Sequence, residues 1–262
     1  MTISTVKSGL QSARRAIRET IRRCGYDVQH YDRARLGQDP FTDIRYFLKG
    51  RERPVIFDVG ANVGQSVDAF RKALPDAIIH SFEPSPGTYA QLSEHCRSLN
   101  RVKTWNVGVG SSQATLTFLE NNDSKMSSFL PLSEHSWGKI VKETKCNVLT
   151  LDSFAEEQHV EFIHVLKTDT QGFDFEVFKG ADRLMKEDRI GLIHFEFIFS
   201  DQYKHLPSFH DVYSFLLERN LSLVTYYKPY FQGDLLSWTD FLFINRKFLR
   251  PCVGDHKSLA PV

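Results

Sequence analysis

The sequence predicts an α/β protein with a Rossmann-like doubly wound sheet, mostly parallel, in which the last strand is antiparallel. Apolar runs of strand length alternate with helical patterns from about residue 51 onward. The first of these runs leads directly into a turn that contains glycines and then into a helix. The last two runs, 221–227 and 240–245, are separated by a linker too short for an ordinary crossover helix. We therefore expect a parallel sheet that is closed by one antiparallel edge strand.

The individual elements follow from apolar periodicity and from the positions of proline and glycine. Strands are expected at 55–59, 77–82, 102–107, 162–169 and 191–197, and helices at 64–74, 86–99, 172–187 and 209–220. The alternation breaks after the third strand, where 114–119 and 146–150 read as short strands of a hairpin-type insertion. The polar stretch 120–137 between them is expected to form a lid over substrate or cofactor. Exposed aromatic residues in the 226–238 linker are expected to stack on sugar rings or other flat apolar faces.

Composition limits the class of protein. With 262 residues, 41% apolar and 25% charged, the chain suits one globular α/β domain. We divide it into a helical N-terminal extension (1–50), the main domain (51–249) and a C-terminal tail (250–262). The net charge of +1 argues against a dedicated nucleic-acid-binding protein, which needs a concentrated basic surface.

Cysteine usage and hydropathy indicate the cytoplasm. Cys24, Cys96, Cys146 and Cys252 are widely separated and include no C-x-x-C pair. This spacing is typical of reduced thiols rather than of a disulfide framework or a zinc site. The sequence contains neither a run of about 18 apolar residues nor an N-terminal apolar signal segment, so we expect a protein without a transmembrane span.

Residues 1–24 form a helical pattern with one apolar face and many basic side chains. Ile17 and Ile21 belong to the apolar face, whereas Arg14, Arg18 and Arg22 lie on the remainder. One interpretation is a helix that packs on the domain or on a partner subunit, which would allow self-association. The other is an interfacial helix that is attracted to anionic lipid or to an anionic glycan.

The first two strands end in residues that suit a nucleoside-containing ligand. The first turn reads D-x-G-x-N-x-G, from Asp58 to Gly64. Gly60 and Gly64 carry no Cβ, so the backbone can approach a ligand closely. Glu83, at the end of the second strand, can accept hydrogen bonds from both hydroxyls of a ribose. Together the two motifs predict a nucleoside-containing cofactor.

The position of the acid favours S-adenosylmethionine over a nicotinamide dinucleotide. A dinucleotide site would show G-x-G-x-x-G facing a pyrophosphate, and an acid before the first glycine suits an ammonium or sulfonium instead. Asp58 as a solvated turn residue is the alternative interpretation. The predicted cofactor-binding residues are Asp58, Gly60, Ala61, Asn62, Gly64, Glu83, Pro84 and Asn106, the last for adenine or ribose.

Five segments resemble the FkbM family of S-adenosylmethionine-dependent methyltransferases over roughly residues 50–245. They are 58–64 (DVGANVG), 82–86 (FEPSP), 150–152 (TLD), 167–172 (KTDTQG) and 177–181 (VFKGA). The resemblance implies a class I methyltransferase fold and methyl acceptors that are hydroxyls of sugars, glycans or polyketides. The chain departs from the family at Gln171, where an acid is usual, and at Phe178, where an aliphatic residue is usual.

Four residues near the ends of strands four and five are catalytic candidates. Asp169 is either a general base or metal ligand, or else a contact for the cofactor ammonium or the N-cap of the 172–187 helix. Lys167 neutralises the acids or orients the acceptor, unless it pairs with Asp152 or Glu196. His194 and Glu196 share one strand face, and they form a base with its orienting partner, metal ligands beside Asp169, or a structural hydrogen-bonded pair.

The sequence thus predicts an S-adenosylmethionine-dependent O-methyltransferase that acts on a hydroxyl of a sugar, a glycan or a natural-product scaffold. Because Gln171 removes an acid from the site, we expect no metal. Two alternatives remain open. One is a nicotinamide-dependent oxidoreductase, which the missing glycine pattern disfavours. The other is a non-catalytic S-adenosylmethionine-binding partner protein, which Gln171 and the basic N-terminal helix would favour.

Overall fold

The computed structural model describes residues 16–17, 19–24 and 36–248. Contacts divide the chain into two units, 1–35 and 36–262. In the first unit, residues 16–17 and 19–23 are helical; the remainder of the predicted 1–24 helix lies outside the described residues, as does the 250–262 tail. Within the described ranges, no helix combines the length and the apolar character that a membrane span needs.

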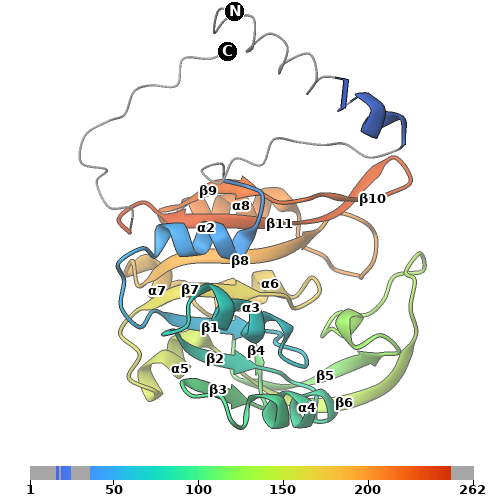
Figure 1. Ribbon diagram of the computed structural model, residues 1–262. Helices are drawn as coiled ribbons and strands as arrows, with labels where there is room; N and C mark the ends of the chain where they lie inside the picture. Colours follow the sequence, from blue (N-terminus) through green and yellow to red (C-terminus); the bar gives the residue numbers. More distant parts are fainter. Residues whose placement is uncertain (1–15, 18, 25–35, 249–262) are drawn as a thin grey trace, which may run out of the picture. The chain divides into compact units, whose positions relative to one another are not determined.

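The second unit is built on an eight-stranded sheet, which confirms the predicted α/β fold (Figure 1). Five strands are parallel and lie side by side in the order β8-β7-β1-β2-β3. A doubly wound sheet places its first and fourth parallel strands side by side, and β1 pairs directly with β7. The bounds are β1 Val55–Val59, β2 Ile78–Phe82, β3 Val102–Trp105, β7 Ile163–Thr168 and β8 Ile190–Ile198.

The antiparallel pairing of the last two long strands is confirmed, but the expected edge position is wrong. β11 (Leu235–Asn245) lies inside the sheet, antiparallel to β8 on one side. Its other side pairs with β9 (Leu221–Tyr226) and with β10 (Tyr230–Gln232). β11 can take this position because the β9–β11 connection is a hairpin that leaves the second edge of β11 free for β8. Much of the expected linker is therefore strand, and Tyr230 stacks on Trp238 with ring centroids 5.0 Å apart.

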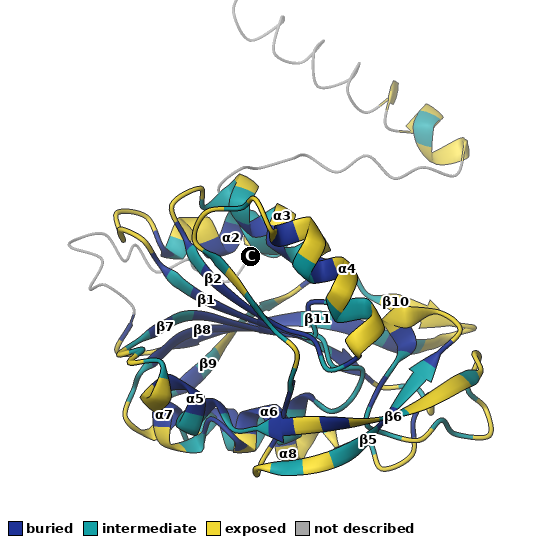
Figure 2. Ribbon diagram, turned by 90° about the horizontal axis from the view of Figure 1, so that it is seen from below, coloured by how far each residue is buried: buried dark blue, intermediate teal, exposed yellow. Residues whose placement is uncertain are grey.

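Helices cover both faces of the sheet (Figure 2). One face carries α2, α3 and α4, and the opposite face carries α5, α6, α7 and α8. The bounds are α2 Pro40–Phe47, α3 Gln65–Ala73, α4 Pro86–Cys96, α5 Leu151–Glu157, α6 Asp174–Lys179, α7 Asp182–Lys186 and α8 Phe209–Leu217.

The single helix predicted for 172–187 is wrong, because the segment forms two short helices. Gly180, between α6 and α7, packs so closely that a Cβ would lie 2.0 Å from the carbonyl oxygen of Gly110. The carboxylate of Asp152 accepts hydrogen bonds from the backbone N–H groups of Arg183 and Leu184, both at 3.0 Å. These bonds satisfy the free donors at the start of α7 and so stabilise the interruption.

Alternate residues of the central strands form two apolar cores, as the period of two in a strand requires. Phe57, Leu166 and Ile193 face the layer of α5 to α8. Ile56, Val165 and Leu192 face the layer of α2 to α4. On this second face, the residues that follow at the carboxyl ends of the same strands are polar, and they form part of the site described below.

The predicted hairpin insertion is confirmed. β5 (Ala114–Asn121) pairs antiparallel with β6 (Ile140–Leu149), and β6 also pairs parallel with β4 (Gly108–Val109). These strands form a separate three-stranded sheet, with a short 3-10 helix η1 (Ser124–Met126) in the connecting loop. Figure 1 shows the insertion beside the carboxyl ends of β1 and β2.

Helix α2 belongs to the compact unit, which begins at Leu36 although the sequence-based boundary lies at residue 50. Asp39 caps the helix by accepting a hydrogen bond from the backbone of Thr42. Ile44 is fully buried in the core that faces α3 and α4. The hydroxyl of Tyr227 donates to the carboxylate of Asp43 at 3.1 Å, so the helix is also fixed to the segment after β9.

We predict that Ile44→Ala lowers the free energy of unfolding by about 2–4 kcal/mol, because the change leaves a cavity in a fully buried site. Urea unfolding followed by circular dichroism measures the change. Arg45→Ala, on the exposed side of the same helix, is the matched control and should change stability by less than about 0.5 kcal/mol. Equal effects of the two substitutions would contradict the placement of α2 in the folded unit.

Candidate functional site

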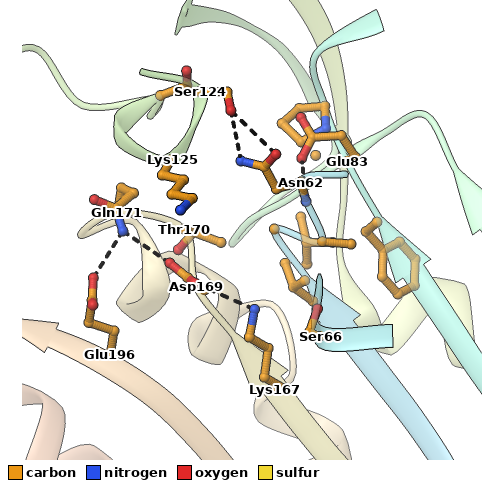
Figure 3. Close-up of a pocket in the computed structure, with 18 of the residues that line it drawn as sticks. Asn62, Ser66, Glu83, Ser124, Lys125, Lys167, Asp169, Thr170, Gln171 and Glu196 are labelled. Atoms are coloured by element: carbon orange, nitrogen blue, oxygen red, sulfur yellow. Dashed lines mark hydrogen bonds and ion pairs between the residues drawn. The ribbon is translucent and has the colours of Figure 1, made fainter. Parts of the chain in front are cut away.

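A cavity of about 430 Å³ lies at the carboxyl ends of β1, β2, β7 and β8 (Figure 3). Ligands of open α/β sheets bind at this edge, where the chain leaves neighbouring strands in different directions. The turns after β1 and β2, the insertion, the loop after β7 and helix α2 all contribute to its wall. Polar and charged lining residues include Asn62, Ser66, Glu83, Ser124, Lys125, Lys167, Asp169, Thr170, Gln171 and Glu196.

The turn after β1 is held against the neighbouring strands. The backbone N–H groups of Gly60 and Ala61 both donate to the carbonyl oxygen of Phe82 at 3.0 Å. Gly60 has a φ of +77°, and a Cβ there would lie 2.0 Å from the carbonyl oxygen of Asp169. Glycine is therefore required at position 60 by the approach of the β7 loop as well as by the cavity. Gly64 lies outside the lining, at the N-cap of α3.

Glu83 is buried at the end of β2 with its carboxylate at the cavity. Its two oxygens accept hydrogen bonds from the backbone N–H groups of Asn62 at 3.1 Å and Ser85 at 3.0 Å. Burial raises the pKa of Glu83 to about 7, although these two hydrogen bonds lower it. Each oxygen keeps a lone pair for a further donor, which suits a pair of ligand hydroxyls.

The wall around Glu83 is largely apolar. Phe82, Pro84 and the segment 107–109 line this end of the cavity, together with Phe118 and Phe129 from the insertion. Asn106 lies outside the lining. Its side-chain amide donates instead to the carbonyl oxygens of Glu83 at 3.0 Å and Pro84 at 3.1 Å. Asn106 thus fixes the backbone that carries the acid.

Lys167 joins two carboxylates at the other end of the cavity. Its ammonium lies 3.3 Å from Oδ1 of Asp58 and 3.6 Å from Oδ2 of Asp169. The lysine is buried, which by itself lowers its pKa, but the two negative charges outweigh this effect and hold the pKa of Lys167 above its ordinary value. The possible pairing of Lys167 with Asp152 or Glu196 is not formed.

Asp58 lies beneath the cavity rather than on its surface. It is fully buried, and the hydroxyl of Ser66 donates to its Oδ2 at 2.5 Å. With Lys167 on the other oxygen, its charge is compensated inside the protein, so Asp58 is not a solvated turn residue. Asp169, by contrast, has 43% of its side chain exposed at the mouth of the cavity. It does not cap a helix, because α6 begins at Asp174 after Phe173.

His194 is buried outside the cavity lining. Its ring packs edge-on against Phe41 and Tyr227, with ring centroids 6.3 Å and 5.8 Å apart. Both ring nitrogens lack a hydrogen-bond partner. Burial, and then the charge of Lys167, lowers the pKa of His194 to about 3, so the ring is neutral. The His194–Glu196 hydrogen bond considered from the sequence is therefore not formed.

Glu196 lies at the cavity beside Gln171 (Figure 3). The side-chain amide nitrogen of Gln171 donates to Oδ1 of Asp169 at 3.0 Å and to Oε1 of Glu196 at 2.9 Å. Burial, and then the charges of Asp169 and Asp240, raises the pKa of Glu196 to about 9. These effects favour the protonated form of Glu196. Among the described residues, no group of three or more His, Cys, Asp or Glu side chains is arranged to hold a metal ion.

The loop of the insertion lies across the cavity and is fastened at both sides. The amide of Asn62 donates to the hydroxyl of Ser124 at 3.2 Å. The hydroxyl of Ser128 donates to the carbonyl oxygen of Gln171 at 2.9 Å. The position of this loop is consistent with the lid expected from the sequence, which stays a prediction because opening is not observed.

Several residues that line the cavity were not predicted from the sequence. They come from α2, from the start of α3, from the segment after β3, from the insertion and, for Thr170, from the loop after β7, and no spacing rule connects these segments. Only the polar loop 120–137 gave a signal, because its length suggested a lid. The residues are Phe41, Gln65, Ser66, Ala69, Val107, Gly108, Val109, Phe118, Ser124, Lys125, Ser127, Phe129 and Thr170.

A Rossmann-like sheet that contains an antiparallel strand, β11, and carries an acid at the end of β2 is the arrangement expected for a class I methyltransferase. Residues 58–223 match the model of the methyltransferase FkbM domain. This match covers more than half of the chain, which therefore belongs to the FkbM methyltransferase family. This match gives no support to the two alternatives, an oxidoreductase or a non-catalytic binding protein.

Three relatives show moderate similarity to this chain. The 2-O-methyltransferase NoeI of Sinorhizobium fredii is 26% identical over 52% of this chain and 60% of its own length. Methyltransferase sdnD of Sordaria araneosa is 29% identical over 60% of this chain and 72% of its own. The hexuronic acid methyltransferase AglP of Haloferax volcanii is 28% identical over 55% and 56%. The chain thus spans less than two thirds of the length of two of these relatives.

S-adenosylmethionine is the cofactor of this class of methyltransferase, and the cavity fits it. Glu83 offers lone pairs for ribose hydroxyls, and the apolar wall beside it suits an adenine ring. Two carboxylates, Asp169 and Glu83, line the cavity on opposite sides. Such a lining suits a cationic ligand without phosphate better than a dinucleotide.

We predict that affinity for S-adenosylhomocysteine falls as the pH is lowered through about 7. The ionised form of Glu83 accepts both ribose hydroxyls, whereas protonation replaces one acceptor site by a donor. Burial raises the pKa of Glu83 to about 7. The association constant for S-adenosylhomocysteine should therefore be highest above that pH and fall by up to about tenfold per pH unit below it. Calorimetric titrations between pH 5.5 and 8.5 measure the dependence.

Glu83→Gln is the matched control, because it keeps the shape of the side chain and removes the titration. Its affinity should be lower than that of the wild type at pH 8 and nearly independent of pH. An equal pH dependence in both proteins would assign the titration to another group and contradict the role of Glu83.

Proposed function

We propose that this protein is an S-adenosylmethionine-dependent O-methyltransferase that acts on a hydroxyl of a sugar, a glycan or a natural-product scaffold. The observation that carries the proposal is Asp169, a carboxylate exposed at the mouth of a cavity whose other end suits a nucleoside. Similarity to NoeI, a 2-O-methyltransferase, and to AglP, a hexuronic acid methyltransferase, supports a sugar-type acceptor.

In this proposal, the cofactor lies along the cavity from the end of β2 to the end of β7. Glu83 holds the ribose hydroxyls, and Pro84 with the apolar residues around it covers the adenine ring. The turn Gly60–Asn62 lies beside the methionine part, with Gly64 at the start of α3. Asp58 lies beneath the cofactor site, where it holds the side chains of Lys167 and Ser66 in place. The side-chain amide of Asn106 fixes the backbone of Glu83.

When bound, S-adenosylmethionine supplies a methyl group on a positively charged sulfur. Bound in the cavity, the cofactor would donate this methyl group to the acceptor oxygen, with an O–CH₃ bond formed as the S–CH₃ bond breaks and the sulfur left as a neutral thioether. Asp169 accepts the proton of the acceptor hydroxyl and later releases it to water. Alignment of the two reactants within the cavity supplies much of the rate enhancement.

The remaining candidates act around Asp169. Lys167 places a positive charge 3.6 Å from its carboxylate and thereby orients it toward the cavity. Glu196 contacts Asp169 through Gln171. His194, buried and neutral, maintains the packing between α2 and the end of β8. This arrangement supports transfer that needs no metal ion, because the amide of Gln171 and the ammonium of Lys167 supply the donors around the carboxylates.

We further propose a small-molecule or glycan acceptor, no nucleic acid partner and a cytoplasmic location. The thiols of Cys24, Cys96 and Cys146 are free, which supports a reducing compartment. Of the predicted 1–50 extension, the part before Leu36 acts as an extension of the catalytic domain, and the helix predicted for residues 1–24 serves for self-association or surface contact. The basic side chains on that helix support the second role.

We predict that Asp169→Asn reduces turnover by about 10²-fold or more and changes cofactor affinity little, because the amide keeps the shape but cannot take a proton. S-adenosylhomocysteine formation is measured with saturating cofactor and a panel of sugars, uronic acids and glycosides. Calorimetry with S-adenosylhomocysteine gives the affinity.

Asp201→Asn, on an exposed loop after β8, is the control for loss of one carboxylate and should behave as the wild type. Preserved turnover in Asp169→Asn with weakened cofactor binding would make Asp169 a contact for the cofactor ammonium. Preserved turnover with preserved binding would remove Asp169 from the site altogether.

A further inference from the structure

Gln171 occupies an unusual position between two acids. Asp169 follows β7 and Glu196 belongs to β8, and the only side chain that hydrogen-bonds to both of them among the described residues is that of Gln171. Figure 3 shows its amide nitrogen between the two carboxyl groups. The primary amide has two hydrogens, so it can satisfy both acids at the same time.

The orientation of this amide is fixed by its other contacts. The hydroxyl of Tyr203 lies 3.0 Å from Oε1 of Gln171 and 3.0 Å from the carbonyl oxygen of Met126 in the insertion loop. A rotated amide would present its oxygen to the two carboxyl groups and its nitrogen to Tyr203. The backbone of Gln171 has a φ of +54°, in the left-handed region, and the hydroxyl of Ser128 holds it there by donating to its carbonyl oxygen.

A divalent cation that displaced the proton of Glu196 would take the same place between the two acids. A magnesium, manganese or calcium ion bound by both oxygens would lie about 2.0–2.6 Å from each of them. The amide nitrogen of Gln171 lies 3.0 Å from Oδ1 of Asp169 and 2.9 Å from Oε1 of Glu196. An ion and the amide therefore compete for one position, and the amide already supplies a donor to each acid.

We propose that Gln171 is a positioning residue that joins Asp169 and Glu196 through its side-chain amide and fills the place of a bridging divalent cation. Tyr203 holds the amide in the required orientation and links it to the insertion loop over the cavity. The proposal deepens the proposed function, because it states how the Asp169 carboxylate is held toward the acceptor. It also assigns a role to the residue at which the chain lacks an acid.

The first experiment measures Mn²⁺ binding by electron paramagnetic resonance on the full-length protein. The wild type should bind no Mn²⁺ at this position, because the side-chain amide of Gln171 occupies it. Gln171→Glu should gain one bound Mn²⁺ per chain, and Asp169→Asn in that background should remove it. A Mn²⁺ ion on the wild type that Asp169→Asn removes would overturn the proposal, as would a failure of Gln171→Glu to bind.

The second experiment measures the titration of Glu196 by NMR of carboxyl-labelled glutamate. The wild type should show one glutamic acid with a pKa near 9, which Glu196→Gln removes from the spectrum. The hydrogen bond from Gln171 lowers this pKa, so Gln171→Leu should shift it upward. Gln113→Leu, an exposed glutamine, should leave it unchanged. An unshifted Glu196 in Gln171→Leu would overturn the proposal.

The groups around Glu196 must be controlled in that titration. They are Asp169 and Asp174 after β7, Asp240 on β11 and Tyr203 in the loop after β8. Tyr203→Phe removes the hydroxyl that orients the amide and keeps the ring, so it should shift the pKa of Glu196 in the same direction as Gln171→Leu and by less. A shift in the opposite direction would contradict the proposed orientation.

Neither experiment needs a methyl acceptor, so the outcome is independent of the proposed function. Suppose that Asp169→Asn keeps full turnover, that Gln171→Glu binds Mn²⁺ and that Gln171→Leu raises the pKa of Glu196. The proposed role of Asp169 as base is then wrong, and the proposed role of Gln171 is supported. If Asp169→Asn loses turnover and Gln171→Leu leaves Glu196 unshifted, the base stands and the bridge is wrong.

Discussion

The site depends on one buried ammonium group, that of Lys167. It lies on β7, next to β1 in the parallel register, where it meets the fully buried Asp58 and the exposed Asp169. Removing one partner of a buried ion pair costs about 3–5 kcal/mol, because the remaining charge has no compensation. The Lys167–Asp58 pair therefore requires both partners, and the same ammonium fixes the Asp169 carboxylate at the mouth of the cavity.

The two ends of the cavity are organised by different physical effects. At the end of β2, an apolar wall and two backbone donors surround one carboxylate, and burial raises its pKa toward neutrality. At the ends of β7 and β8, several acids lie close together, and a lysine and a glutamine separate them. The insertion loop reaches both ends, since it contacts Asn62 through Ser124 and the backbone of Gln171 through Ser128.

Much of this arrangement could be predicted from the sequence, because the strands alternate strictly and end in polar residues. The neighbourhood of Asp58 and Asp169 followed from the topology of a doubly wound sheet. The sequence left several partners open for Lys167, because only the register of β7 against β1 brings its ammonium to Asp58 and Asp169. The interior position of β11 was also not predicted, because it depends on which strand of the β9–β11 hairpin pairs with β8. The aromatic and serine residues of the insertion come close to Glu83 and Gln171 only in three dimensions.

Gln171 is the clearest example of information that only the structure provides. In the sequence it is a departure from a family pattern and suggests a weakened site. In the structure it is a fully bonded side chain whose donors and acceptor all face suitable partners.

The most direct test of the account is a crystal structure of the protein with S-adenosylhomocysteine. We expect both ribose hydroxyls within hydrogen-bond distance of the Glu83 carboxylate and the sulfur directed toward Asp169, with Lys167 still paired to Asp58 beneath it. A complex in which the ribose contacts neither oxygen of Glu83, or in which the sulfur points away from Asp169, would contradict the account.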